Sequence, residues 1–118
     1  VGGEVHKVKQ GKRGAVIIQT SGLAYTVHEI THVRQGLDAG GLQFSQYKLL
    51  KNPGINDKEW QKSSGYNEVE AYKAQFSFDP RSIHGVSSIF NITLEYVGNI
   101  KYNDSYGYPW LHDYLYEK

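Results

Sequence analysis

The sequence contains no cysteine, no methionine and only three prolines in 118 residues, and its formal net charge is only +1. Without cysteine, the chain can form neither disulfides nor thiolate metal sites. The near-neutral charge and the lack of a long basic run argue against a nucleic-acid partner. The longest aliphatic run, Ala-Val-Ile-Ile at residues 15–18, is too short to span a membrane or to form the core of a signal peptide.

The composition is that of a small folded domain. Hydrophobic residues make up 39% of the chain and charged residues 21%, so the chain can bury one modest core. Tyrosine occurs ten times and suits a core beside a polar cleft, because it buries its ring and keeps its hydroxyl hydrated. We expect a single domain over residues 1–118, and the start at Val1 without any methionine indicates a fragment of a longer precursor.

The N-terminal third predicts a β-hairpin followed by a helix. Residues 4–10 alternate apolar and polar side chains, and after a Gly-Lys-Arg-Gly turn residues 15–21 are apolar and rich in β-branched side chains. A helix should then run from about residue 22 to residue 35. Ser21 is its expected N-cap, and Gly36 should end it in a left-handed conformation.

An apolar stripe predicts which side of this helix is buried. Leu23, Val27, Ile30 and Val33 recur at spacings of three and four residues. We expect this stripe to pack against the rest of the domain and to leave the histidines on a neighbouring face.

The second half of the chain predicts loops and a second long helix. Residues 37–64 are rich in loop-forming stretches, Lys-Ser-Ser-Gly at 62–65 among them. A helix should begin at Tyr66 and end before Asp79-Pro80. Residues 91–100 fit a short helix or a strand, and the spacing of their aliphatic residues favours the helix.

The pentapeptide His28-Glu29-Ile30-Thr31-His32 carries the main chemical signal. On a helix, residues four apart project from one face, so both imidazoles can reach a common point. Neutral imidazole is a favoured Zn²⁺ ligand, and zinc lowers the pKa of a bound water towards 7. Glu29 is placed to act as the general base towards such a water. The alternative is a surface helix with two solvated histidines.

A zinc site of this kind needs a third protein ligand. The second predicted helix offers Glu68 and Glu70. Residues two apart on a helix point about 200° apart, so only one of the two can face the metal. Helix geometry alone leaves the choice between them open.

The sequence "HEITH", followed thirty-odd residues later by "EVEAY", resembles the gluzincin group of zinc metallopeptidases. In that group a downstream Glu, three residues before an Ala, is the third ligand, and here this position is Glu68. The resemblance implies a minimal zincin-like α+β fold, with a small antiparallel sheet packed against the two ligand-bearing helices. Where these families often have Asp or Asn to support a ligand histidine, this chain has Tyr72, so that support must come from elsewhere.

A second resemblance, to the C-terminal domains of some bacterial RHS-repeat-associated proteins, rests on residues 27–36, 65–80 and 92–109. Such domains often carry polymorphic-toxin activities. This resemblance implies a secreted or cell-surface location as part of a larger bacterial protein.

Peptidases of this type also supply a donor that stabilises the oxyanion. His84, which closely follows the second helix, is our first candidate. For each candidate taken singly, an ordinary surface or core role is more common than a role in stabilising the oxyanion. The remaining candidates are Arg81, Tyr106, Tyr108 and His112.

Together these patterns predict a zinc metallopeptidase acting on a peptide or protein, with His28, His32 and Glu68 as ligands and Glu29 and His84 as catalytic residues. One alternative is an inactive metal-binding structural or interaction domain, against which Glu29 argues because a structural site needs no base. Another is a metal-free domain that presents its tyrosines to a partner. The ligand set also suits Mn²⁺, Fe²⁺ or Co²⁺.

Overall fold

The computed structural model describes residues 7–10, 16–38, 44–45, 48–49 and 58–117. The fold is mixed and mostly helical, with small antiparallel sheets, so the predicted α+β class is confirmed at that level. The elements in chain order are β1 (Lys7–Gln10), β2 (Val16–Gln19), α1 (Leu23–Asp38), β3 (Phe44–Ser45), β4 (Lys48–Leu49), α2 (Lys58–Phe78), the 3₁₀ turns η2 (Pro80–Ser82) and η3 (Ile89–Asn91), α3 (Leu94–Gly98), β5 (Lys101–Tyr102), β6 (Ser105–Tyr106) and α4 (Pro109–Tyr116).

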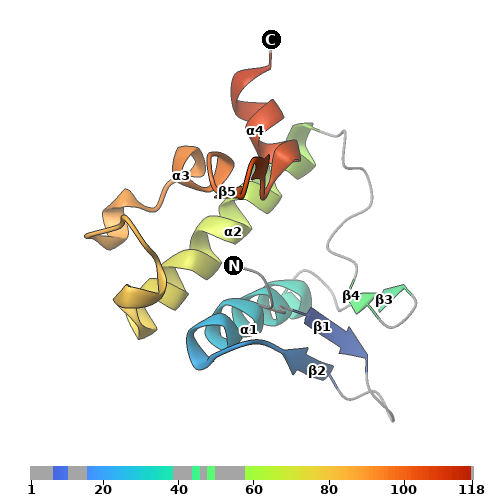
Figure 1. Cartoon of the computed structure of the whole chain (residues 1–118). Helices are drawn as coiled ribbons and strands as arrows, with labels where there is room; N and C mark the ends of the chain where they lie inside the picture. The colour runs from blue at the N-terminus through green and yellow to red at the C-terminus, as the bar shows by residue number, and fades with distance from the viewer. Residues whose placement is uncertain (1–6, 11–15, 39–43, 46–47, 50–57, 118) are drawn as a thin grey trace.

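The predicted hairpin forms one half of the four-stranded N-terminal sheet. Strands β1 and β2 pair antiparallel, with Lys7 opposite Gln19 and Gln10 opposite Val16. The strand order is β2-β1-β4-β3, and β4 joins the outer side of β1. The β1–β2 hairpin lies along α1, on the side away from α2 (Figure 1).

The predicted first helix exists, but both of its ends differ from the prediction. The first helical hydrogen bond runs from the Thr26 N–H to the Gly22 carbonyl at 3.0 Å, so Gly22 rather than Ser21 takes the capping position. The helix continues through Gly36 to Asp38. An ion pair between Arg34 and Asp38, one turn apart at 3.1 Å, supports this last turn.

The predicted buried stripe of α1 is wrong at Leu23 and Ile30, whereas Val27 and Val33 are half-buried. Leu23 and Ile30 are 73% and 51% exposed, whereas His28 and His32 are buried. The side of α1 that packs on α2 is the polar one, because its side chains form hydrogen bonds across the interface. Hydrophobic spacing therefore identified the helix but not its buried face.

Helix α2 begins at Lys58, eight residues before the predicted start at Tyr66, and ends at Phe78 as predicted. The expected loop at residues 62–65 is helical. A Cβ added at Gly65 would lie 2.8 Å from side-chain carbons of both Leu94 and Leu111. Gly65 thus allows α3 and α4 to approach α2 closely, which is a packing role rather than a loop signal.

Helices α3 and α4 cover the side of α2 opposite α1 (Figure 1). The predicted short helix within residues 91–100 is confirmed as α3, whose N-cap Thr93 accepts a hydrogen bond from the Tyr96 N–H at 3.1 Å. None of the helices in the described ranges combines the length and the hydrophobicity needed to cross a bilayer. The core between these helices is formed by Val69, Tyr72, Ile83, Ile92, Val97 and Leu111.

Candidate metal centre

Three buried side chains converge where α1 packs on α2. The four-residue spacing places His28 and His32 on one face of α1, and Glu68 projects towards them from α2. Glu68 Oε1 lies 3.1 Å from His28 Nε2 and 3.0 Å from His32 Nε2, and the two Nε2 atoms are 3.2 Å apart. All three residues are at most 7% exposed.

The spacing of these atoms fits a small divalent ion. A tetrahedral ion with ligand distances of about 2.0–2.1 Å holds its ligands about 3.3 Å apart. The observed separations of 3.0–3.2 Å lie within a few tenths of an ångström of that value. Two imidazole nitrogens and one carboxylate oxygen are also donors that first-row divalent metals accept. This buried group could therefore bind a metal ion, and the donor set by itself does not select which one.

Glu70 lies outside this cluster and binds other groups. Its carboxylate accepts hydrogen bonds from Arg34 Nη2 at 2.6 Å and from Gln35 Nε2 at 2.7 Å. These contacts, the Gln35 bond first, lower the pKa of Glu70 below its ordinary value. The structure thus brings Glu68, and not Glu70, to the histidines.

Two glutamines contact the Nδ1 atoms of the histidines, on the side of each ring away from Glu68. Gln75 Oε1 lies 3.0 Å from His28 Nδ1, and Gln35 Oε1 lies 2.9 Å from His32 Nδ1. Tyr72 makes a different contact: its ring packs nearly perpendicular to that of His28, with centroids 4.4 Å apart. The hydrogen-bond partners of the two imidazole Nδ1 atoms are therefore Gln35 and Gln75.

Neither glutamine was predicted from the sequence, although the spacing of each from a clustered residue is a helical one. Gln35 follows His32 by three residues, about one helical turn, and Gln75 follows Glu68 by seven, about two turns. Gln35 therefore lies on the same helix face as His32, and Gln75 on the same face as Glu68.

Glu29 is buried at 5% exposure and lines the same cleft as His28. The cleft has a volume of about 770 Å³ and opens between α1, α2 and the segment from η2 to β5. Within the described part of the chain, no hydrogen bond to the Glu29 carboxylate forms. Its oxygens therefore remain available to a molecule bound in the cleft.

Tyrosines form much of the cleft wall. The hydroxyls of Tyr72 and Tyr108 lie 2.7 Å apart, and the Tyr102 hydroxyl lies 3.4 Å from that of Tyr72. Burial raises the pKa of both the Tyr72 and the Tyr108 hydroxyl well above the ordinary value. Both hydroxyls therefore stay neutral at physiological pH, and one of them donates its hydrogen to the other. Tyr25 and Tyr96 also line the cleft.

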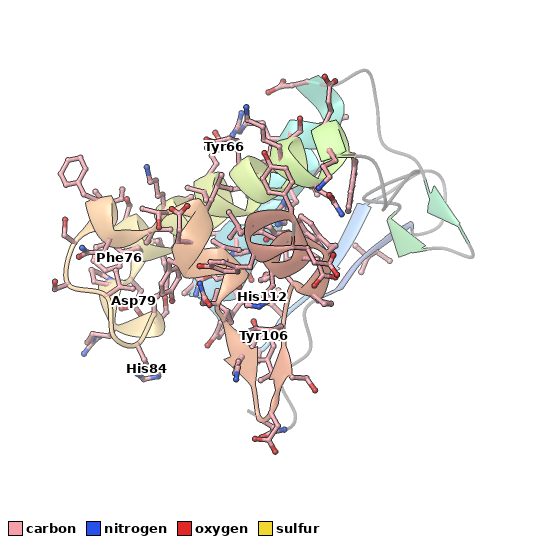
Figure 2. The ribbon with its side chains drawn as sticks, turned by 90° about the horizontal axis from the view of Figure 1, so that it is seen from above. Tyr66, Phe76, Asp79, His84, Tyr106 and His112 are labelled. Carbon is pink, nitrogen blue, oxygen red and sulfur yellow. The ribbon has the colours of Figure 1, made fainter. Side chains whose placement is uncertain are left out.

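His84 borders this cleft but is exposed. It lies on the loop after η2, and its ring points away from the body of the molecule (Figure 2). Tyr102, which sequence analysis did not single out, is connected through Tyr72 to the ring of His28.

The other predicted oxyanion donors are engaged elsewhere, apart from Tyr108 in the cleft wall. Tyr106 stacks on His112 with ring centroids 3.7 Å apart (Figure 2). His112 also contacts the Gly98 carbonyl through Nδ1 at 3.1 Å, which links α4 to the end of α3. Arg81 is exposed and lies 3.6 Å from the Asp79 carboxylate.

Comparison with known proteins adds no relative: no protein-family model, curated protein or solved structure matches this chain.

Proposed function

We propose that the chain is a zincin-like, zinc-dependent hydrolase, and specifically a metallopeptidase with Glu29 as its general base. The observation that carries this proposal is the placement of Glu29: a buried carboxylate without a hydrogen-bond partner in the described part of the chain, on the wall of the cleft that His28 also lines. A purely structural metal site needs no such base and usually uses four protein ligands. The described residues supply three.

The residues divide the chemistry between them. When bound, the ion would act as a Lewis acid and would lower the pKa of water towards 7. Glu29 takes the proton from the water that attacks the peptide carbonyl carbon. As the carbon–nitrogen bond breaks, Glu29 passes that proton to the departing amine, so the carboxylate returns to its starting state.

The opposite side of the cleft offers donors for the oxyanion that forms on the attacked carbonyl. His84 at the rim keeps this role in our proposal, and the Tyr102 hydroxyl is a second candidate because it is linked through Tyr72 to His28. Aromatic rings along the wall supply apolar surface for a peptide.

Glu29→Gln tests the proposal, because it removes the base and preserves the size of the side chain. We expect the variant to keep wild-type metal content and thermal midpoint but to cleave a mixed fluorogenic peptide library about 10²–10⁴-fold more slowly. Glu95→Gln is the matched control, since it also neutralises a glutamate of the cleft wall and should keep activity within a few-fold.

Two outcomes contradict the proposal. Wild-type rates in Glu29→Gln mean that another group is the base. A wild-type chain that binds metal and cleaves no peptide in the library supports the structural or interaction module instead.

A further inference from the structure

We infer that Gln35 and Gln75 are positioning residues that hold both ligand histidines in the tautomer with hydrogen on Nδ1, so that each Nε2 offers its lone pair to the metal. This inference rests on the metal centre of the proposed function. It adds that part of the metal affinity is encoded outside the ligands, in two separate hydrogen-bond chains.

The hydrogen-bond chain that orients His28 begins at the Asp79 backbone carbonyl, which can only accept a hydrogen bond. The Ser82 hydroxyl donates its single hydrogen to the Asp79 backbone carbonyl at 2.7 Å. Ser82 Oγ must then accept from Gln75 Nε2, 3.1 Å away. Because the Gln75 amide nitrogen faces Ser82, its carbonyl oxygen faces His28 Nδ1 at 3.0 Å. A carbonyl oxygen can only accept a hydrogen bond. The hydrogen of His28 therefore lies on Nδ1.

The hydrogen-bond chain that orients His32 begins at different acceptors and also places the hydrogen on Nδ1. Gln35 Nε2 donates to the Asn67 backbone carbonyl at 3.0 Å and to Glu70 Oε1 at 2.7 Å, and both of these oxygens are acceptors. The Gln35 carbonyl oxygen consequently faces His32 Nδ1 at 2.9 Å and accepts its hydrogen. Arg34 holds Glu70 in place through a 2.6 Å hydrogen bond.

These tautomers explain the polarity of the cluster. With hydrogen on both Nδ1 atoms, two Nε2 lone pairs and a Glu68 carboxylate oxygen converge at separations of 3.0–3.2 Å. Three converging acceptors repel one another in a buried site, and a cation between them removes that repulsion. The glutamines thus prepare a site that favours a metal ion.

The two chains differ in burial, which predicts unequal effects. Gln75 is 2% exposed, whereas the chain through Gln35 ends at the half-exposed pair of Glu70 and Arg34. Water can replace a lost acceptor in the exposed hydrogen-bond chain through Gln35 more easily than in the buried one through Gln75. Loss of Gln75 should therefore weaken metal binding more than loss of Gln35.

The test measures zinc affinity by competition with a chromophoric chelator. We expect Gln75→Leu to weaken zinc binding about 10–100-fold, and Gln35→Leu by about tenfold or less. Gln75→Glu, which keeps an oxygen acceptor for His28 Nδ1, should restore affinity to within a few-fold of wild type. Gln61→Leu removes another buried glutamine of α2, two turns before Glu68, and should leave the affinity unchanged.

A second variant covers the case in which Gln75→Leu fails to fold. Ser82→Ala leaves Gln75 in place and removes only the hydroxyl that orients its amide, so zinc should still bind, about tenfold or less weaker. Long-range ¹H–¹⁵N spectra of the zinc-loaded wild type should also show both ligand histidines protonated on Nδ1.

The possible failures are distinguishable. A wild-type chain that binds no zinc overturns the proposed function itself. Tight zinc binding that is unchanged in Gln75→Leu, Gln35→Leu and Ser82→Ala, or a ligand histidine protonated on Nε2, overturns this inference and leaves the proposed function standing.

Discussion

Helix α2 has two buried faces of opposite character. Towards α3 and α4 it presents Val69 and packs against Leu111 in an apolar core. Towards α1 it presents Glu68 and Gln75, which contact the histidines through hydrogen bonds. Glu68 and Val69 are neighbours in sequence and both buried, at 4% and 8% exposure. Burial alone therefore does not distinguish the face that stabilises the fold from the face that carries the site.

The difference has a thermodynamic consequence. Apolar burial stabilises the α2–α3–α4 side with or without a bound metal, because it removes hydrocarbon from water. Polar burial on the α1 side costs free energy unless every group is paired. We therefore expect the packing of α1 on α2 to depend on a bound cation, and the packing of α4 on α2 to be independent of it.

The largest expected effect on stability comes from the apolar face. Leu111 is fully buried, so Leu111→Ala should lower the free energy of unfolding by about 2–5 kcal/mol. Zinc affinity of the folded variant should remain that of wild type, because Leu111 is absent from the hydrogen bonds that hold the ligand histidines. Urea unfolding and chelator competition measure the two quantities, and a joint loss of both would show that the two faces are coupled.

Metal addition should act on the other face. Zinc at a hundredfold excess over its dissociation constant should raise the free energy of unfolding by about 2.7 kcal/mol, and a chelator should reverse the effect. Hydrogen exchange should show the added protection mainly in amides of α1 (Leu23–Asp38), with less in α4 (Pro109–Tyr116). Equal added protection of α1 and α4 would contradict the expectation that only the packing of α1 on α2 depends on the cation.

The smallest effect is expected at the solvent edge of the polar face. Arg34 pairs with Glu70 and Asp38, and these contacts raise its pKa, the Glu70 hydrogen bond first. Such exposed pairs contribute little, so Arg34→Ala should change zinc affinity by about twofold. The same chelator competition measures this, and a loss as large as that of Gln75→Leu would mean that the exposed chain supports the metal as strongly as the buried one.

Local patterns predicted the parts of the fold that depend on neighbours in sequence. The hairpin, the first helix and the short α3 follow from alternation and helical spacing. The start of α2 was missed because Gly65 serves close packing with Leu94 and Leu111, a contact that no local pattern reveals. The buried side of α1 was missed because hydrogen bonds across the interface, rather than hydrophobic spacing, determine it.

The site shows the same division. His28, Glu29 and His32 were predicted because their spacing within one helix is itself the signal. Gln75 contacts His28 from 47 positions away, and that pairing requires the packed helices. For the same reason, the exposed position of His84 could not be read from its closeness in sequence to α2.

The central claim is that His28, His32 and Glu68 hold one divalent ion, and elemental analysis of the chain purified without added metal tests it most directly. The wild type and the control Glu59→Gln, altered on the same helix, should carry about one zinc or similar ion per chain. His28→Ala/His32→Ala and Glu68→Gln should lose it. A wild type without metal, or full metal content in the ligand variants, would contradict the account.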